Sequence, residues 1–225
     1  MAELHLKEIR GRVADAARRS GRDPAAVVLV AVSKTADVDG LQAAYDAGQR
    51  DFGENRAADL VERARLMPGD VHWHFVGRLQ GNKVRRVRPV THLLHSLDRE
   101  DLARYWAKGR GLPPPVLVQI NVGREPQKAG VLPESAADLV EAALGVGLDV
   151  RGLMTMPPMV EDPEDARPWF REMARLRDRL AERWPRVREL SMGMTDDFEV
   201  AVEEGATILR VGRAIFGSTA AEQER

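Results

Sequence analysis

Cysteine is absent from this chain of 225 residues. Its absence excludes disulfide bonds, thiolate nucleophiles and thiolate metal sites, and it is typical of a protein that works in a reducing compartment. Residues 1–19 carry charged side chains throughout and lack the apolar stretch of a signal peptide. No segment is long and apolar enough to span a membrane. We therefore expect a cytoplasmic protein.

An excess of charge of one sign is also missing, because 34 Lys and Arg residues nearly balance 35 Asp and Glu residues. A balanced chain creates no field that attracts nucleic acid or a membrane surface, so we expect neither as a partner. The local exception is the basic run at residues 83–88. Such a run is typical of a solvated helix face, and a phosphate or partner site is the alternative.

The chain has no linker, low-complexity segment or long Pro/Gly tract. We therefore predict one domain over residues 1–225. Apolar runs alternate with amphipathic stretches, and eight runs are candidate strands: 27–34, 50–55, 71–77, 91–98, 115–121, 149–156, 188–194 and 206–217. Residues 38–48 and 170–184 have apolar side chains at helical spacing. Thr195 is a candidate N-cap of a further helix, with Asp196 and Asp197 in its first turn.

Near-continuous apolar strands that alternate with helices favour a parallel sheet covered on both faces. Eight such units predict a (β/α)8 TIM barrel, with an extra helix at residues 4–18. An open doubly wound sheet is the alternative, and the lack of a GxGxxG turn after the first strand counts against it. Barrel chemistry gathers at the C-terminal strand ends. We expect polar side chains and no carboxylate there.

Lys34 follows the apolar residues 27–32, so it lies at the end of a buried strand. Partial desolvation lowers the pKa of a lysine and makes its amine nucleophilic toward carbonyl groups. A lysine that extends into solvent from a strand end fits the same position. Lys34 alone leaves both interpretations open.

The last two strands offer an anion site. Gly212 would let the backbone approach a ligand closely, and the N–H groups after it would begin the final helix, where unpaired donors and the helix dipole attract anions. Ser191 and Gly193 end the seventh strand. Barrels often hold phosphate in the loops after strands 7 and 8. Two ordinary turns are the alternative.

A reactive lysine opposite a phosphate site describes a site for pyridoxal 5'-phosphate (PLP), because this cofactor carries its aldehyde and its phosphate on opposite parts of one ring. Arg210 is the candidate contact of the ring nitrogen. A guanidinium stays protonated, so it would donate to an unprotonated ring nitrogen and leave the ring a weak electron sink. This favours a cofactor that is held more than used.

Four histidines fall on two neighbouring strands. We expect His74 to line the cofactor pocket and His72 to pack in the core. A metal cluster is the alternative, but the spacing of His92 and His95 is a poor fit to one strand face. We predict no metal.

Eight stretches along the chain carry a family resemblance: VAVSK, DFGENR, HWHFVGRLQGNK, HSLDR, INVGREPQKAG, GLMTM, LSMGMTDDFEVAVEEGAT and RVGRAIFG. In this order the chain resembles the PLP-binding homeostasis protein family, small single-domain barrels related in fold to the N-terminal domain of alanine racemase. The resemblance implies that Lys34 forms an internal aldimine with PLP. It also implies that Asn55 lies near the ring and that Arg210 faces the pyridine nitrogen. The implied phosphate contacts are Ser191, the Met192 backbone, and the N–H groups of Gly212 and Arg213.

The chain departs from the family pattern at three positions. Thr195 stands where the family commonly has Ser, and it keeps the hydroxyl. Arg124 and Gln127 replace residues that are often small and hydroxylated, while Lys128 and Gly130 remain. We expect these changes to affect the fine detail of that loop and not cofactor binding.

Family members look like cofactor carriers without an established reaction. The resemblance therefore implies a PLP carrier or regulator that supplies PLP-dependent apo-enzymes. We expect a monomer, because a barrel needs no partner to close. Alanine racemase uses a second base, a tyrosine from another domain, whereas Tyr45 and Tyr105 lie in predicted helices and the sequence ends soon after its eighth strand. Two alternatives stay open: a weak single-domain amino-acid racemase with Lys34 and either His74 or water as bases, and a Schiff-base aldolase without PLP.

Overall fold

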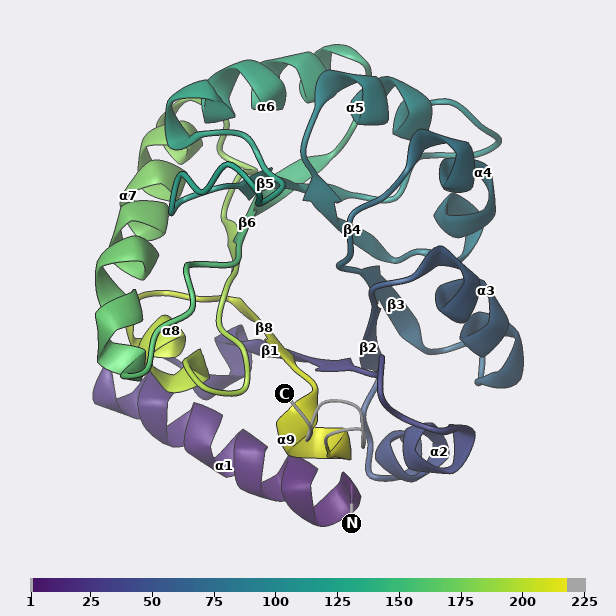
Figure 1. Ribbon diagram of the computed structural model, residues 1–225, viewed down its shortest axis with the longest axis vertical. Helices are drawn as coiled ribbons and strands as arrows, with labels where there is room; N and C mark the ends of the chain where they lie inside the picture. Colours follow the sequence, from purple (N-terminus) through teal and green to yellow (C-terminus); the bar gives the residue numbers. More distant parts are fainter. Residues whose placement is uncertain (1, 218–225) are drawn as a thin grey trace.

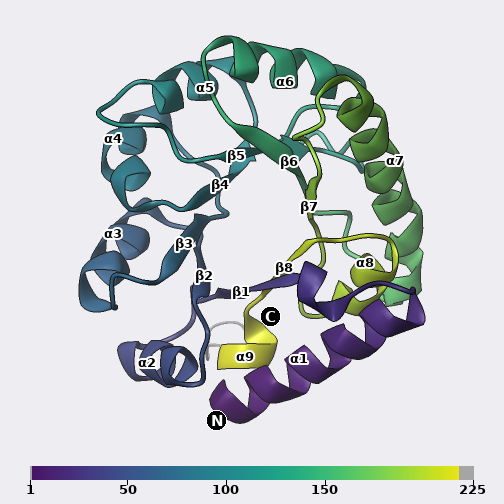
Figure 2. The same ribbon diagram turned by 180° about the vertical axis from the view of Figure 1, so that it is seen from behind.

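The computed structural model describes residues 2–217. Its strands form a closed barrel in chain order, and every neighbouring pair is parallel. Figures 1 and 2 show the strands around the centre and the helices around the outside. The strands are β1 (Val28–Val32), β2 (Asp51–Glu54), β3 (His72–Phe75), β4 (Leu93–Leu97), β5 (Val116–Ile120), β6 (Val150–Thr155), β7 (Glu189–Ser191) and β8 (Ile208–Val211). The predicted barrel is confirmed.

The helices cover the outer face of the barrel. They are α1 (Ala2–Arg19), α2 (Val38–Asp46), α3 (Ala57–Leu66), α4 (Val84–Val87), α5 (Glu100–Ala107), α6 (Ala136–Gly145), α7 (Arg167–Arg183), α8 (Phe198–Glu203) and α9 (Arg213–Phe216). One-turn 3₁₀ helices occupy Pro24–Ala26, Gly81–Lys83, Arg88–Val90, Pro133–Ser135 and Pro163–Ala166. None of the helices within residues 2–217 is long and apolar enough to cross a membrane.

Helix α1 is the extra element that the sequence predicts before the first strand. It buries Leu6, Ile9 and Val13 at helical spacing, and it packs along α8, α9 and α2 (Figure 2). Burying each such side chain stabilises the fold by roughly 1.5–3 kcal/mol. The helix therefore closes the side of the barrel on which the first and last strands meet.

Side chains alternate between the two faces of each strand, which gives the barrel two cores. The larger core lies between strands and helices. A smaller cluster takes one residue from each of five strands and fills part of the barrel interior: Val30, Leu93, Leu117, Met154 and Ile208. The polar side chains described below occupy other inward positions.

Two local predictions are wrong. Residues 195–197 form a turn, and α8 begins at Phe198 with Asp197 as its N-cap residue in place of Thr195. The Asp197 carboxylate accepts a hydrogen bond from the Met194 N–H, which holds that turn before the helix begins. In the basic run, Arg85 and Arg86 are solvated as expected. Arg88 is buried, because it donates to the carbonyls of Trp106, Arg110 and Gly111.

Candidate functional site

The predicted site residues gather at the C-terminal ends of the strands. Lys34 lies in a turn just after β1, and Asn55 follows β2; both side chains are exposed. The backbone pairing of Val32 with Gly53, and of Ala31 with Val211, brings the ends of β1, β2 and β8 to one rim. Lys34 therefore shares this mouth of the barrel with Asn55 and Gly212.

The turn that carries Lys34 is held from outside the barrel. Arg63 on α3 donates one guanidinium N–H to the Ser33 carbonyl and another to the Ala36 carbonyl, the latter at 2.8 Å. The same guanidinium forms an ion pair with Glu54, whose Oε1 also accepts from the Ser33 hydroxyl. The backbone on both sides of Lys34 is thus fixed by one side chain.

Glu54 is a carboxylate at a strand end where the sequence predicts none. It is fully buried and faces the helices, not the barrel axis. Burial raises the pKa of Glu54, against the hydrogen bond from Ser33 and the charge of Arg63. Among residues 2–217 its Oε2 atom has no hydrogen-bond partner. Its role is to hold Arg63 against the turn, since a buried carboxylate needs a paired cation.

The loops after β7 and β8 approach other backbone closely. Gly193 has φ 93°, and a Cβ atom there would lie 2.6 Å from the Ala201 Cβ atom. A Cβ atom at Gly212 would lie 2.9 Å from the Val32 carbonyl oxygen. Gly212 directly precedes α9; the N–H groups of Ile215 and Phe216 donate to the Gly212 carbonyl, and the first-turn donors without an intrahelical acceptor are those of Arg213 and Ala214. The start of α9 therefore leaves backbone donors at the rim, next to the end of β1, whereas the N–H groups of Met192 and Met194 beside Gly193 are already bonded.

Arg210 lies in the barrel interior, 5% exposed. Its Nη1 atom donates to Ser191 Oγ at 2.6 Å and its Nη2 atom to the Thr155 carbonyl at 2.8 Å. Burial lowers the pKa of Arg210 to about 10, and Asp197 opposes that shift. The guanidinium therefore stays charged at neutral pH.

The remaining predicted residues lie close to Arg210 in the chain. Met192 is buried in the outer core, and its backbone N–H donates to the Ile208 carbonyl at 3.1 Å, so the structure does not support the predicted phosphate contact of the Met192 backbone. Arg213 is exposed and pairs with Asp196 at 2.5 Å, which leaves its backbone N–H at the start of α9. The carbonyl of Gly193 accepts from the Arg210 N–H at 3.0 Å, which ties the loop after β7 to β8.

The histidines contradict one prediction. The His72 side chain is 50% exposed and stacks on His92, with ring centroids 4.4 Å apart. It therefore lies at the N-terminal mouth and not in the core. His74 is buried, and its two ring nitrogens bond to Asp51 and His95. Within the described part of the chain, no group of three or more His, Cys, Asp or Glu side chains could hold a metal ion.

His95 is a residue of this network that the sequence does not reveal. It is fully buried, its Nε2 atom lies 2.8 Å from His74 Nδ1, and its Nδ1 atom lies 2.8 Å from Ser191 Oγ. Ser191 is 96 positions away in the chain. The contact arises only because β4 and β7 face each other across the barrel.

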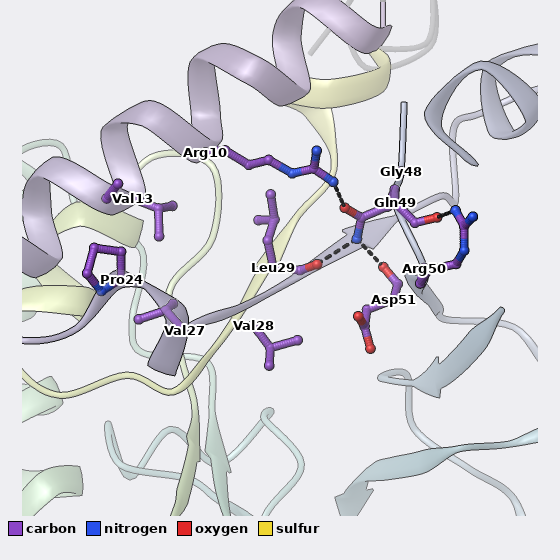
Figure 3. Close-up of a pocket in the computed structure, with 11 residues that line it drawn as sticks. Arg10, Val13, Pro24, Val27, Val28, Leu29, Gly48, Gln49, Arg50 and Asp51 are labelled. Atoms are coloured by element: carbon purple, nitrogen blue, oxygen red, sulfur yellow. Dashed lines mark hydrogen bonds between the residues drawn. The ribbon is translucent and has the colours of Figure 1, made fainter. Parts of the chain in front are cut away.

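Two hollows lie outside this set of residues. One, of about 440 Å³, opens between α1 and the starts of β1 and β2, and Figure 3 shows Arg10, Gln49 and Asp51 along it. The other, of about 390 Å³, lies beside the Lys34 turn, between Thr35–Asp39 and Ile215–Gly217. The first is at the opposite ends of the strands from Lys34.

Similarity to known proteins covers nearly the whole chain. Residues 4–220 match the family model for the alanine racemase N-terminal domain. A pyridoxal phosphate homeostasis protein from Aquifex aeolicus is 41% identical over 94% of this chain and 96% of its own length. One from Schizosaccharomyces pombe is 36% identical over 99% of this chain and 96% of its own length.

This chain belongs to the pyridoxal phosphate homeostasis protein family.

Solved structures of similar proteins have the same fold as this chain. PipY from Synechococcus elongatus, solved with PLP bound, has a TM-score of 0.79 and 32% identity, and the match covers 96% of this chain and all of PipY. Alanine racemase from Corynebacterium glutamicum has a TM-score of 0.71 at 13% identity, covering 95% of this chain and 62% of that enzyme. The second likeness shows the fold alone, so the homeostasis family shares its barrel with the racemase.

Proposed function

We propose that this protein binds PLP as a Schiff base on Lys34 and acts in intracellular PLP homeostasis and cofactor supply. The observation that carries the proposal is the arrangement at the C-terminal mouth: an amine at the end of β1, and glycine-lined loops after β7 and β8 with backbone donors at the start of α9. The same mouth has a buried guanidinium beneath it. Relatives named for PLP homeostasis over nearly the full length support it, as does the PLP-bound structure of PipY.

The residues fit the cofactor in their chemistry. Bound PLP would supply an electrophilic aldehyde, and the Lys34 amine is exposed to meet it. Asn55 and His74 are the proposed neighbours of the ring. Arg210 is the proposed donor to the pyridine nitrogen, and its fixed charge suits a nitrogen that carries no proton. The proposed phosphate contacts are Ser191 and the N–H groups of Gly212 and Arg213.

The cradle for the phosphate depends on the absence of side chains. A Cβ atom at either Gly193 or Gly212 would collide with neighbouring atoms at 2.6 and 2.9 Å. With glycines at these two positions no side chain covers the loops after β7 and β8, and the Arg213 and Ala214 N–H groups at the start of α9 are the donors at that point of the rim. The proposal predicts that this point receives the phosphate.

We propose further that the protein has no robust enzymatic activity. The ring of PLP is the strongest electron sink when a carboxylate keeps its nitrogen protonated, whereas Arg210 offers a cation that stays protonated and leaves that nitrogen without a proton. The two tyrosines that could act as a second base lie on helices: Tyr45 donates to Asp70 at 2.8 Å, and Tyr105 is 51% exposed on α5. A monomeric, cytoplasmic carrier that meets PLP-dependent apo-enzymes transiently is the form we propose.

Lys34→Ala tests the covalent role. The variant should lose the visible absorbance band of a Schiff base while its thermal unfolding stays close to that of the wild type, because an exposed strand-end lysine contributes little packing. Lys108→Ala is the matched control and should keep the band, since Lys108 lies beyond the end of α5. A Lys34→Ala protein with an unchanged band would refute the assignment.

Exchange of amino-acid α-protons in deuterated water separates a carrier from the racemase alternative. The proposal predicts no exchange above that of free PLP. Exchange that depends on Lys34 would favour a single-domain racemase. A colourless protein that takes up no added PLP would favour the aldolase alternative, in which the same loops bind a sugar phosphate.

A further inference from the structure

A single chain of hydrogen bonds crosses the barrel interior. It runs from Asp51 Oδ1 to His74 Nε2 (3.1 Å), from His74 Nδ1 to His95 Nε2 (2.8 Å) and from His95 Nδ1 to Ser191 Oγ (2.8 Å). Arg210 Nη1 completes it at 2.6 Å from Ser191 Oγ. The chain connects the starts of β2 and β3 to the residues proposed beneath the cofactor.

Only one end of this chain reaches solvent. The Asp51 side chain is 27% exposed and lies 3.3 Å from His72 Nδ1, whose side chain is 50% exposed. His95 and Ser191 are fully buried and Arg210 is 5% exposed. Figure 3 shows the Asp51 carboxylate directed away from Gln49, while its backbone oxygen accepts from that side chain. Protons can therefore exchange with water at the N-terminal mouth, opposite Lys34.

The hydrogen-bond donors that link Arg210, Ser191, His95, His74 and Asp51 can be counted. Arg210 always donates, so Ser191 Oγ accepts from it. With both histidines neutral, every bond is satisfied when the Ser191 hydroxyl donates to His95 Nδ1. His95 Nε2–H then donates to His74 Nδ1, and His74 Nε2–H donates to Asp51. All the hydrogen bonds then point from Arg210 toward Asp51.

One further proton reverses the direction of the hydrogen bonds between His74, His95 and Ser191. If His74 carries protons on both nitrogens, its Nδ1–H donates to His95 Nε2. The single proton of His95 then lies on Nδ1 and is donated to Ser191 Oγ. The Ser191 oxygen now accepts from both His95 and Arg210, and its own hydroxyl proton is released for another acceptor. The second arrangement differs from the first by one proton taken from solvent.

We propose that His74 and His95 are positioning residues that form a two-state switch, in which proton uptake at the N-terminal mouth frees the Ser191 hydroxyl to donate at the cofactor mouth. That the new acceptor belongs to PLP rests on the proposed function. The switch itself rests on the hydrogen-bonded chain alone.

The electrostatics of the interior suit such a switch. Burial lowers the pKa of His95 well below its usual value, and His74, Arg210 and His92 add to that effect; His95 therefore keeps one proton and can only change which nitrogen holds it. Burial alone would raise the pKa of Asp51, but the hydrogen bond and charge of His74, with His72, hold it below its usual value. The carboxylate is thus ready to pair with a protonated His74.

Charged and titratable side chains on the surrounding strands and loops face this row of hydrogen bonds. Arg151 on β6 disfavours the charged form of His92, and Asp197 before α8 favours the charged form of Arg210. Besides these groups, Asp51 on β2, His72 and His74 on β3, and His92 and His95 at β4 interact with one another electrostatically. The switch must work within this field.

Nitrogen NMR of the histidine rings in PLP-free protein tests the switch without the cofactor. As the pH is lowered, His95 should change from the Nε2–H to the Nδ1–H form while it stays neutral, in step with proton uptake by His74. Asp51→Asn should move this change to lower pH, because the charged His74 loses its partner. Asp70→Asn, which removes an exposed carboxylate that pairs with Arg50 and Tyr45, should leave it unmoved. A His95 ring that keeps one form throughout would overturn the switch.

PLP titrations then test the coupling. As the pH falls, the affinity of the wild type should rise relative to that of His95→Asn, by up to about tenfold per pH unit. The ratio cancels the ionisation of free PLP and of Lys34. Parallel pH profiles for the two proteins would overturn the coupling and leave the proposed function intact. A wild type that takes up no PLP at any pH would overturn the proposed function, and the NMR result would still decide the switch.

Discussion

The two sides of the candidate site are held in opposite ways. On the β1 side, Lys34 is exposed, and the turn around it is held from outside the barrel by the partly buried Arg63, which pairs with the buried Glu54. On the β8 side, Arg210 is itself buried and is held from inside through Ser191. An amine that forms and breaks a covalent bond must be reachable, whereas a guanidinium that only donates must be immobile. The packing of each side is what the proposed roles of Lys34 and Arg210 require.

Breaking the ion pair between Arg63 and Glu54 should have the largest effect on stability. Arg63→Met leaves the buried Glu54 carboxylate unpaired, which typically costs about 3–5 kcal/mol of unfolding free energy. Urea unfolding of the variant measures it. The double variant with Glu54→Gln should recover much of the loss, since the buried charge is then gone. A single variant as stable as the wild type would show that the pair does not hold the turn.

The Gly193→Ala variant should show the next largest loss of stability. The new Cβ atom would lie 2.6 Å from the Ala201 Cβ atom, at a φ of 93° that other residues rarely adopt. We expect a loss of about 1–3 kcal/mol together with weaker PLP retention. Gly11→Ala is the control, because a Cβ atom there has nothing within 4 Å. Equal stability of the two variants would contradict the proposed close packing of the loop after β7.

Arg210→Met tests the inner side with little change in volume. It removes the donors to Ser191 and Thr155 but leaves the Lys34 turn untouched. We expect the Schiff base to form with PLP affinity lowered about tenfold, the usual size for one lost charged hydrogen bond, and with a shifted absorbance maximum. Absorbance titration measures both. An unchanged affinity and spectrum would remove the proposed contact with the ring nitrogen.

A substitution of His92 should give the smallest effect, a change in how the stability of the protein depends on pH. Burial lowers its pKa to about 4, and repulsion from His74 and His72 adds to this. An unfolded histidine binds a proton below about pH 6.5. Between these two values the unfolded chain holds more protons, so stability is full above about pH 6.5 and falls as the pH approaches 4. The His92 side chain is exposed, so solvent screens the repulsion and the decline in stability should be small. His92→Gln should flatten this decline in melting temperature, and an equally steep decline would assign it to other groups.

Much of the fold could be predicted because each strand is buried on both faces and therefore appears as an apolar run. Lys34 and Gly212 could be located for the same reason, since they stand where such runs end. Helix α8 shows the limit of local reasoning: Thr195 looks like an N-cap, but the bond from the Met194 N–H to Asp197 moves the start of the helix to Phe198.

The supporting residues could not be predicted, because they depend on which strands and helices meet. Nothing in the sequence distinguishes Arg63 from the other arginines; the packing of α3 places its guanidinium at the ends of β1 and β2. His95 is one histidine of an apolar strand until the closed barrel brings Ser191 to its ring. In this chain, these are the supporting residues that only the structure reveals.

Peptide mass mapping after borohydride reduction tests the central claim most directly. Purified protein incubated with PLP is reduced and digested, and the pyridoxyl mass is located. The account predicts that the mass lies on the peptide containing Lys34 and that the visible band disappears on reduction. A pyridoxyl mass that is absent from Lys34 while another lysine carries it in full would contradict the account.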